Sequence, residues 1–281
     1  MVKPILIAAS LAAALPSYDT YAKLYDRLAS GSTVASLEDV LPGLAGNLKT
    51  ANAVSAKYWT DSAPFDEVAK AYILPDNVLD ALGIRHEAAG GVVHVPAGLM
   101  HTYGYLFSQL KTPYGLKGKR WIESRLDERL GLPAGTFGPL APKGEFASNV
   151  TAAFLKLAGE RPYIISAAKI KLSSKAVGSI EQRVAWKTPD GKIEKASVFT
   201  HLVPLKPLAD FETKDSYLLI YSVVRDGRRL LVTGFPIDKT FAEAIMKTPP
   251  QKSAAFVPRF NLYIDPSWIV VSQENRGFKP R

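Results

Sequence analysis

Residues 216–235 read SYLLIYSVVRDGRRLLVTGF. Two apolar runs, 216–224 and 229–235, flank Asp226 and Gly227. An Asp-Gly pair between two strand-like runs favours a β-hairpin, because glycine readily takes the positive φ that the turn requires. The first run is apolar at both alternating positions. We therefore expect it to be a strand inside a sheet, buried on both faces.

A second hairpin signal lies upstream of the first. Pro189-Asp190-Gly191 joins the run 183–187 to the run 192–203. Residues 241–247 have a helical pattern, and residues 262–264 and 268–271 are typical of further strand. The C-terminal part of the chain therefore predicts an antiparallel sheet.

The character of the sequence changes near residues 159–162. Before this point the spacing of apolar residues is mainly helical. The expected helices begin at Ser36, where Asp39 completes a capping pattern, and cover residues 65–72, 76–82, 98–110, 119–130 and 147–157. The fold class predicted is α+β, with an N-terminal helical half packed on a C-terminal antiparallel sheet. No flexible linker divides the halves, so we expect one domain, residues 23–281, with a helical half 23–160 and a sheet half 161–281.

The N-terminus resembles a secretory signal peptide. One positive charge at Lys3 is followed by the eleven-residue apolar run ILIAASLAAAL, residues 5–15, which is too short to cross a bilayer. Thr20-Tyr21-Ala22 is a passable cleavage site, and the cut could shift by a few residues. We expect a signal peptide over residues 1–22, no transmembrane segment, and a periplasmic or secreted protein.

Composition excludes several function classes. The chain has 281 residues, of which 47% are hydrophobic, and it contains no cysteine. A disordered protein, a disulfide framework and a thiolate metal site are therefore excluded. The formal net charge of +9 favours anionic partners. Nucleic acid is not expected, because no nucleic-acid-binding motif accompanies the charge.

The candidate ligand site is a basic loop that leads into the helix expected from residue 119. Five cations lie between residues 111 and 125 against one acid, Glu123, and two aromatic residues stand among them. A helix start offers unpaired amides to an anion, and aromatic rings can stack on an apolar part of a ligand. The candidate ligand-binding residues are Lys111, Tyr114, Lys117, Lys119, Arg120 and Trp121.

An alternative is a cofactor-independent, hydrolase-like enzyme. His101 and Tyr105 share one face of the expected helix 98–110, whose end leads into the basic loop. An imidazole beside a hydroxyl can transfer protons, and Arg120 could stabilise a developing negative charge. His86, His94 and His101 are spaced by eight and seven residues, which is weak evidence for a metal site, so we expect neither a metal nor a cofactor.

The leading function expected is binding of a small anionic or amphipathic molecule by an exported protein. The enzyme with His101, Tyr105 and Arg120 is the second hypothesis. A third is an envelope interaction protein that has no pocket.

Overall fold

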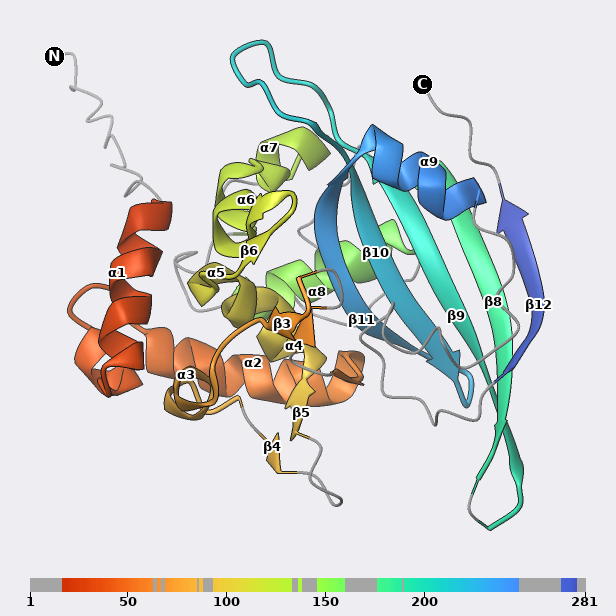
Figure 1. Ribbon diagram of the computed structural model, residues 1–281, viewed down its shortest axis with the longest axis horizontal. Coiled ribbons are helices and arrows are strands. Elements are labelled where there is room, and N and C mark those ends of the chain that lie inside the picture. Colours follow the sequence, from red (N-terminus) through yellow and green to blue (C-terminus); the bar gives the residue numbers. More distant parts are fainter. Residues whose placement is uncertain are drawn as a thin grey trace, which may run out of the picture.

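The computed structural model describes residues 17–62, 65–66, 69–84, 86–87, 93–132, 136–137, 146–159, 176–188, 190–247 and 269–276. Helices occupy the N-terminal half and an antiparallel sheet occupies the C-terminal half, one beside the other (Figure 1). The predicted α+β fold class is confirmed: the last described helix of the N-terminal half ends at Leu157, and the first strand of the main sheet begins at Gly178.

Ten helical segments belong to the helical half as described. They are α1 (Tyr18–Ala29), η1 (Val34–Leu37), α2 (Leu44–Tyr58), α3 (Asp76–Ala81), α4 (Ala97–Leu99), η2 (Met100–Gly104), α5 (Tyr105–Phe107), α6 (Lys117–Glu123), α7 (Leu126–Leu130) and α8 (Phe146–Leu157). Seven short strands lie between them: β1 (Asp61–Ser62), β2 (Phe65–Asp66), β3 (Ala71–Tyr72), β4 (His86–Glu87), β5 (Val93–Pro96), β6 (Lys111–Thr112) and β7 (Gly115–Leu116).

The main sheet has five antiparallel strands in the order β11-β10-β9-β8-β12. They are β8 (Gly178–Lys187), β9 (Ile193–Pro204), β10 (Asp215–Arg225), β11 (Arg228–Asp238) and β12 (Ile269–Arg276), with helix α9 (Lys239–Lys247) after β11. Both predicted hairpins are confirmed, β8 with β9 and β10 with β11. As expected, β10 is an interior strand. The pairing of β10 with β11 shifts register between Tyr221 and Ser222.

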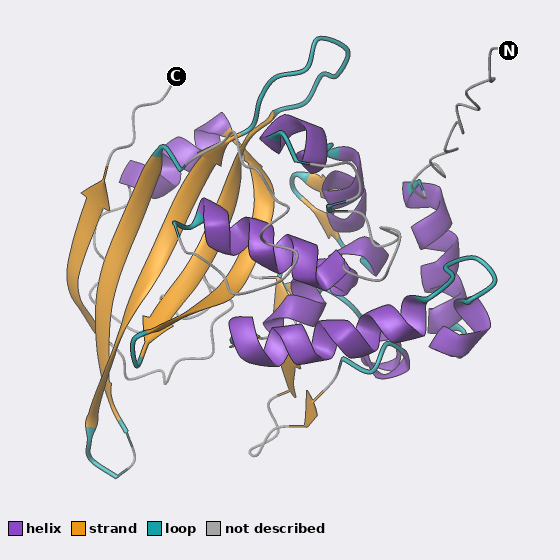
Figure 2. Cartoon of the chain, turned by 180° about the vertical axis from the view of Figure 1, so that it is seen from behind, coloured by secondary structure: helices purple, strands orange, loops and turns teal. Residues whose placement is uncertain are grey.

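The two faces of this sheet pack against different partners. Helices α2 and α8 lie on one side of the sheet and α9 lies across the other (Figures 1 and 2). Leu218, Ile220 and Leu231 join the large core of the helical half, whereas Leu219 and Val232 join a second cluster beneath α9. This division follows from the strand repeat, in which successive side chains point to opposite faces.

Two predicted helices are wrong. Residues 65–72 contain the strands β2 and β3, which pair with each other, and Lys70 before β3 has a φ of 57° that a helix does not allow. No α-helix begins at Ser36. A 3₁₀ turn comes first, and α2 begins at Leu44, where the Glu38 carboxylate accepts hydrogen bonds from the amides of Gly43 and Ala45.

Two other predicted helices are interrupted. The segment expected to be a helix over 98–110 ends at Phe107 and contains the π-helical turn η2, in which the hydroxyl of Thr102 bonds to the carbonyl of Gly98. The helix expected over 119–130 begins earlier, at Lys117, and breaks at Arg125, which has a φ of 50°. The side chain of Arg125 forms ion pairs with Glu128 in α7 and with Asp210, which is distant in sequence.

The expected cleavage position after Ala22 lies inside α1, where the side chains of Tyr18 and Tyr21 are buried. Residues 1–16 and the expected strand 262–264 lie outside the described residues. Within the described part of the chain, none of the helices combines the length and the apolar character needed to cross a bilayer.

Candidate functional site

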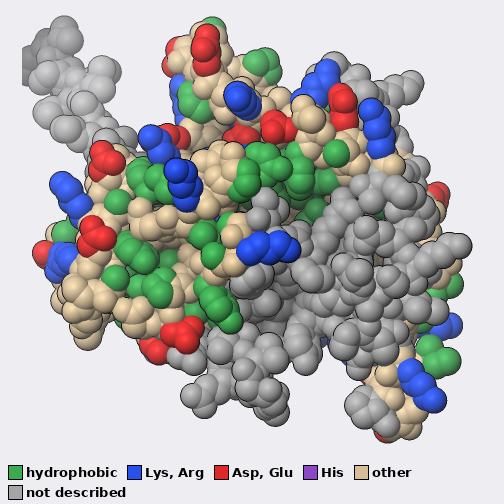
Figure 3. Space-filling view, viewed as in Figure 1, with side chains coloured by type: hydrophobic (Ala, Val, Ile, Leu, Met, Phe, Trp, Pro, Cys, Tyr) green, Lys and Arg blue, Asp and Glu red, His purple; other side chains and the backbone are tan. Residues whose placement is uncertain are grey.

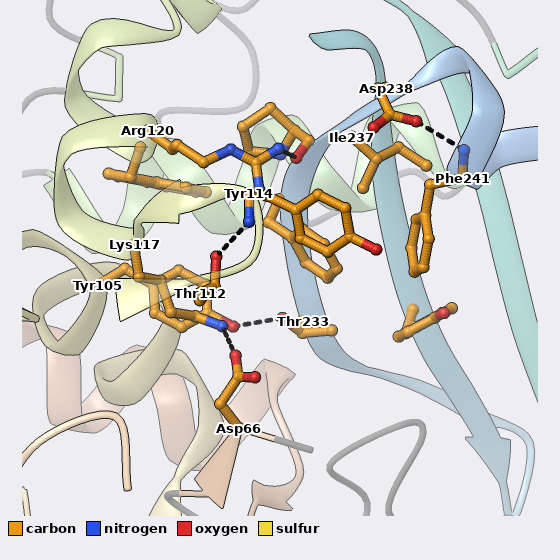
Figure 4. Close-up of a pocket in the computed structure, with 14 residues that line it drawn as sticks. Asp66, Tyr105, Thr112, Tyr114, Lys117, Arg120, Thr233, Ile237, Asp238 and Phe241 are labelled. Carbon is orange, nitrogen blue, oxygen red and sulfur yellow. Dashed lines mark hydrogen bonds and ion pairs between the residues drawn. The ribbon is translucent and has the colours of Figure 1, made fainter. Parts of the chain in front are cut away.

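The described residues form a pocket where the edge strand β11 meets the helical half and α9. The cavity volume is about 80 Å³. One water needs about 10–15 Å³ and an enclosed cavity that binds benzene is about 150 Å³, so this cavity has room for a polar group and part of a ring. Figure 4 shows the pocket. Its lining residues are Asp66, Tyr105, Thr112, Tyr114, Lys117, Arg120, Trp121, Tyr221, Thr233, Phe235, Pro236, Ile237, Asp238 and Phe241.

The aromatic wall comes from both halves of the chain. Tyr114, in the turn between β6 and β7, is 46% exposed, and its ring lies 5.9 Å from that of Phe241 on α9. Trp121 is buried and packs edge-on against Tyr105 at 5.8 Å. On the face drawn in Figure 3, hydrophobic side chains gather between the helical half and the sheet, with lysine and arginine side chains around them.

Five residues of β11 line the pocket, and three of them do so because a strand repeats every two residues. Thr233, Phe235 and Ile237 share one face of the strand. Gly234 points to the opposite face, where a Cβ atom would lie 2.4 Å from the ring of Phe154 on α8. This close approach holds β11 against the helical half.

Lys117 supplies one cation at the polar end of the pocket. Its ammonium lies 2.5 Å from Oδ2 of Asp66, and both side chains are largely buried. The ammonium also lies 4.6 Å from the centre of the Tyr105 ring. Burial lowers the pKa of Lys117, but the neighbouring Tyr105 and Asp66 outweigh it and the pKa is raised, so Lys117 carries its charge.

Arg120 supplies the second cation. Its Nη2 donates to Oδ1 of Asp215 at 2.5 Å and to the carbonyl of Pro236 at 2.8 Å, and its guanidinium lies 5.5 Å from the centre of the Tyr114 ring. A proline carbonyl is open to this bond because β11 is at the edge of the described sheet. Each cation of the pocket therefore has its own buried or partly buried carboxylate.

A chain of hydrogen bonds leads from the pocket into the core. The Tyr105 hydroxyl lies 3.1 Å from Oγ1 of Thr233, and that oxygen lies 3.0 Å from Nδ1 of His101. His101 is fully buried, with its ring stacked at 6.2 Å on that of Trp59. Burial holds the pKa of His101 well below its ordinary value, and the charge of Lys117 lowers it further. Burial also raises the pKa of Tyr105, so the phenol stays protonated.

The structure brings together five of the residues singled out from sequence. Tyr105, Tyr114, Lys117, Arg120 and Trp121 line the pocket. The described lining does not include the other three, His101, Lys111 and Lys119. His101 reaches the pocket through Thr233, Lys111 is exposed on β6, and Lys119 is half-exposed and 3.8 Å from Glu123.

The anion-site hypothesis requires unpaired backbone amides at the start of the helix, and the first two amides of α6 are paired. The amide of Lys117 donates to the carbonyl of Leu110 at 2.9 Å, and the amide of Gly118 donates to that of Ser108 at 3.3 Å. These two amides are occupied by the chain itself. A ligand in the pocket therefore meets side chains rather than a helix start.

Several lining residues were not singled out from the sequence. Asp66 lies in a stretch expected to be helical, and Thr233, Phe235 and Ile237 lie in a strand that carries no motif. Phe241 belongs to a helix that was predicted only from the helical pattern of residues 241–247. The alternation along residues 233–237 was the one available signal, because it places these three side chains on one face.

Within the described residues, no group of three or more histidine, aspartate or glutamate side chains is placed to hold a metal ion. His86 and His94 are register partners of β4 and β5, and their side chains lie outside the description.

The chain matches no protein-family model, and no curated protein or solved structure matches it either.

Proposed function

We propose that this chain is an exported protein that binds a small amphipathic molecule in the pocket between β11, α6 and α9. The observation that carries the proposal is a cavity with aromatic walls and one polar end. Ligand pockets are usually apolar clefts with a few convergent polar groups, and this pocket has that character. The export part of the proposal depends on residues 1–22 of the sequence.

The charges favour an amphipathic ligand over a strongly anionic one. Lys117 and Arg120 are each bound to a carboxylate, Asp66 and Asp215 respectively. A fully charged ligand would have to compete with these carboxylates for the same cations. A neutral polar group needs only a hydrogen bond, so it fits the pocket without breaking an ion pair.

The aromatic rings at the mouth define how the ligand would enter. Tyr114 on the β6–β7 turn and Phe241 on α9 form a contacting pair, with their rings 5.9 Å apart (Figure 4). Tyr114 is the more exposed, so we infer that it covers the apolar body of a bound molecule. A ligand larger than one ring would extend past these side chains into solvent.

The proposal is tested by calorimetric titration with single-ring probes that share one body: 4-ethylphenol, 4-ethylacetophenone, 4-ethylbenzoate and ethylbenzene. We expect saturable binding of at least one probe at one site. Tyr114→Ala should weaken it about tenfold, the equivalent of about 1.4 kcal/mol. Tyr72→Ala is the matched control, because Tyr72 is an exposed tyrosine outside the described lining, and it should leave the affinity within about twofold. If none of the four probes binds, the proposed function is wrong.

The acid–base role of His101, Tyr105 and Arg120 stays a prediction. Tyr105 and Arg120 line the pocket, whereas His101 acts on it only through Thr233. Any proton transfer between His101 and a bound molecule would therefore have to pass through Thr233.

A further inference from the structure

The hydrogen-bond chain at the polar end of the pocket has a definite direction. Lys117 can only donate hydrogen bonds. Its ammonium lies 4.6 Å from the centre of the Tyr105 ring, so its positive charge repels a hydroxyl hydrogen that turns toward it. The hydroxyl hydrogen of Tyr105 must therefore point away from Lys117, and Thr233 is the acceptor at 3.1 Å.

The next hydrogen bond, between Thr233 and His101, runs in the same direction. The Thr233 hydroxyl accepts from Tyr105, so its own hydrogen is available for Nδ1 of His101 at 3.0 Å. His101 is neutral, because burial and Lys117 keep its pKa low, and a neutral imidazole can accept at Nδ1. The imidazole proton is then on Nε2, a buried atom with no hydrogen-bond partner among the described residues. The chain of hydrogen bonds runs from Tyr105 to Thr233 and His101.

This direction decides what the pocket offers to a ligand. The Lys117 ammonium has three N–H groups, and Asp66 accepts from one of them. Lys117 lines the pocket, so another of its N–H groups can donate to a ligand there. The Tyr105 hydrogen is engaged by Thr233, so the Tyr105 oxygen presents a lone pair. The polar end therefore combines one donor with one acceptor.

We propose that the ligand is a hydroxyl compound with a single ring at its polar end, a phenol or a cyclic alcohol. This inference rests on the proposed function and names its ligand class. One hydroxyl group accepts from Lys117 and donates to Tyr105 at the same time. A ketone satisfies Lys117 alone, and a carboxylate sets its oxygens against the Tyr105 lone pair and the carboxylate of Asp66.

The same titrations test this class, with 4-ethylphenol against 4-ethylacetophenone and 4-ethylbenzoate. We expect the phenol to bind about tenfold more tightly than the ketone, because the ketone leaves the Tyr105 acceptor unpaired. Equal affinity for the three probes, or preference for the benzoate, would overturn the inference and leave the proposed function standing. Binding of none would remove both.

A substitution at Thr233 tests the direction itself. Thr233→Val keeps the size of the side chain but removes the acceptor for the Tyr105 hydrogen, which then turns into the pocket because Lys117 repels it. The preference for phenol over ketone should fall from about tenfold to about onefold. Thr233→Ser retains the hydroxyl and should retain the preference. A circular-dichroism melting curve establishes that each variant is folded, and an unchanged preference in folded Thr233→Val contradicts the proposed direction.

Discussion

The ammonium of Lys117 and the carboxylate of Asp66 lie 2.5 Å apart, with side chains only 15% and 9% exposed. Breaking a buried pair by removing one partner leaves the other charge desolvated and uncompensated. Lys117→Met should therefore lower the free energy of unfolding by about 3 kcal/mol, as measured by urea denaturation.

The pair Lys119–Glu123 on the same helix is the matched control. Its side chains are 51% and 52% exposed, and its atoms lie 3.8 Å apart. Lys119→Ala should change the free energy of unfolding by less than about 0.5 kcal/mol. Adding Asp66→Asn to Lys117→Met should recover part of the lost stability, and no recovery would show that the pair is not the cause.

Gly118 allows α6 to begin against the end of α5. A Cβ atom there would lie 2.7 Å from the carbonyl oxygen of Ser108 and 2.8 Å from that of Tyr105. These are backbone atoms, so Gly118→Ala should cost about 1–3 kcal/mol of stability. It should also weaken probe binding, since Lys117 is the preceding residue. Gly46→Ala in α2 provides the contrast: no described atom lies within 4 Å of its Cβ position, and we expect a gain of about 0.5–1 kcal/mol. Equal effects in the two melting curves would contradict the packing argument.

Two buried imidazoles predict how stability depends on pH. Burial, with the charge of Arg229, lowers the pKa of His201 to about 4, and burial with the charge of Lys117 holds the pKa of His101 well below its ordinary value. An unfolded histidine titrates near pH ~6.5. Between about pH 6.5 and 4 the unfolded state therefore binds protons that the folded state does not. Stability is fully present above pH ~6.5 and is lost as the pH falls.

The expected loss below pH ~6.5 is about 1.4 kcal/mol per pH unit for each of the two imidazoles. Urea unfolding midpoints at successive pH values measure it. His201→Gln should remove one of the two contributions to this slope. A stability that stays constant from about pH 7 to 5 would show that neither imidazole is held neutral by folding.

The buried tyrosines of α1 predict where an export signal would be cut. The Tyr18 hydroxyl donates to Oε1 of Gln109, and Tyr21 packs edge-on against Phe107 at 5.8 Å. Cleavage after Ala22 would remove both side chains. We therefore expect the mature chain to begin before Tyr18. N-terminal sequencing of the exported protein checks this directly.

The cost of the shorter form can be measured separately. A chain that begins at Lys23 should be at least about 3 kcal/mol less stable than one that begins at Ser17, because each buried aromatic side chain contributes on that scale. A mature protein that begins at Lys23 and is equally stable would contradict the assigned role of α1.

The sheet could be predicted from sequence because its signals are local. Asp226-Gly227 and the turn at 189–191 set both hairpins, and α9 and α8 appear close to their predicted bounds. The errors fall where a contact distant in the sequence decides the conformation. The break of the helix at Arg125 goes with its ion pair to Asp210, and Asp66, in a stretch predicted to be helical, lies on a strand and pairs with Lys117.

The candidate site was predictable in part for the same reason. Tyr105, Lys117 and Arg120 could be selected by charge and spacing, because they lie close together in the chain. Their partners Asp66, Asp215 and Thr233 are distant in sequence, and no local pattern marks them. The sequence indicates where cations gather, but only the fold shows that each is already matched by an acid.

The segments that surround the pocket extend from β2, near residue 66, to α9, near residue 241. No contiguous fragment of the chain contains all the residues that line the pocket. A molecule that binds there therefore stabilises the folded state of the whole chain. A molecule that fits the pocket would slow proteolysis at sites far from it. The lifetime of the folded chain would then follow the local supply of such a molecule.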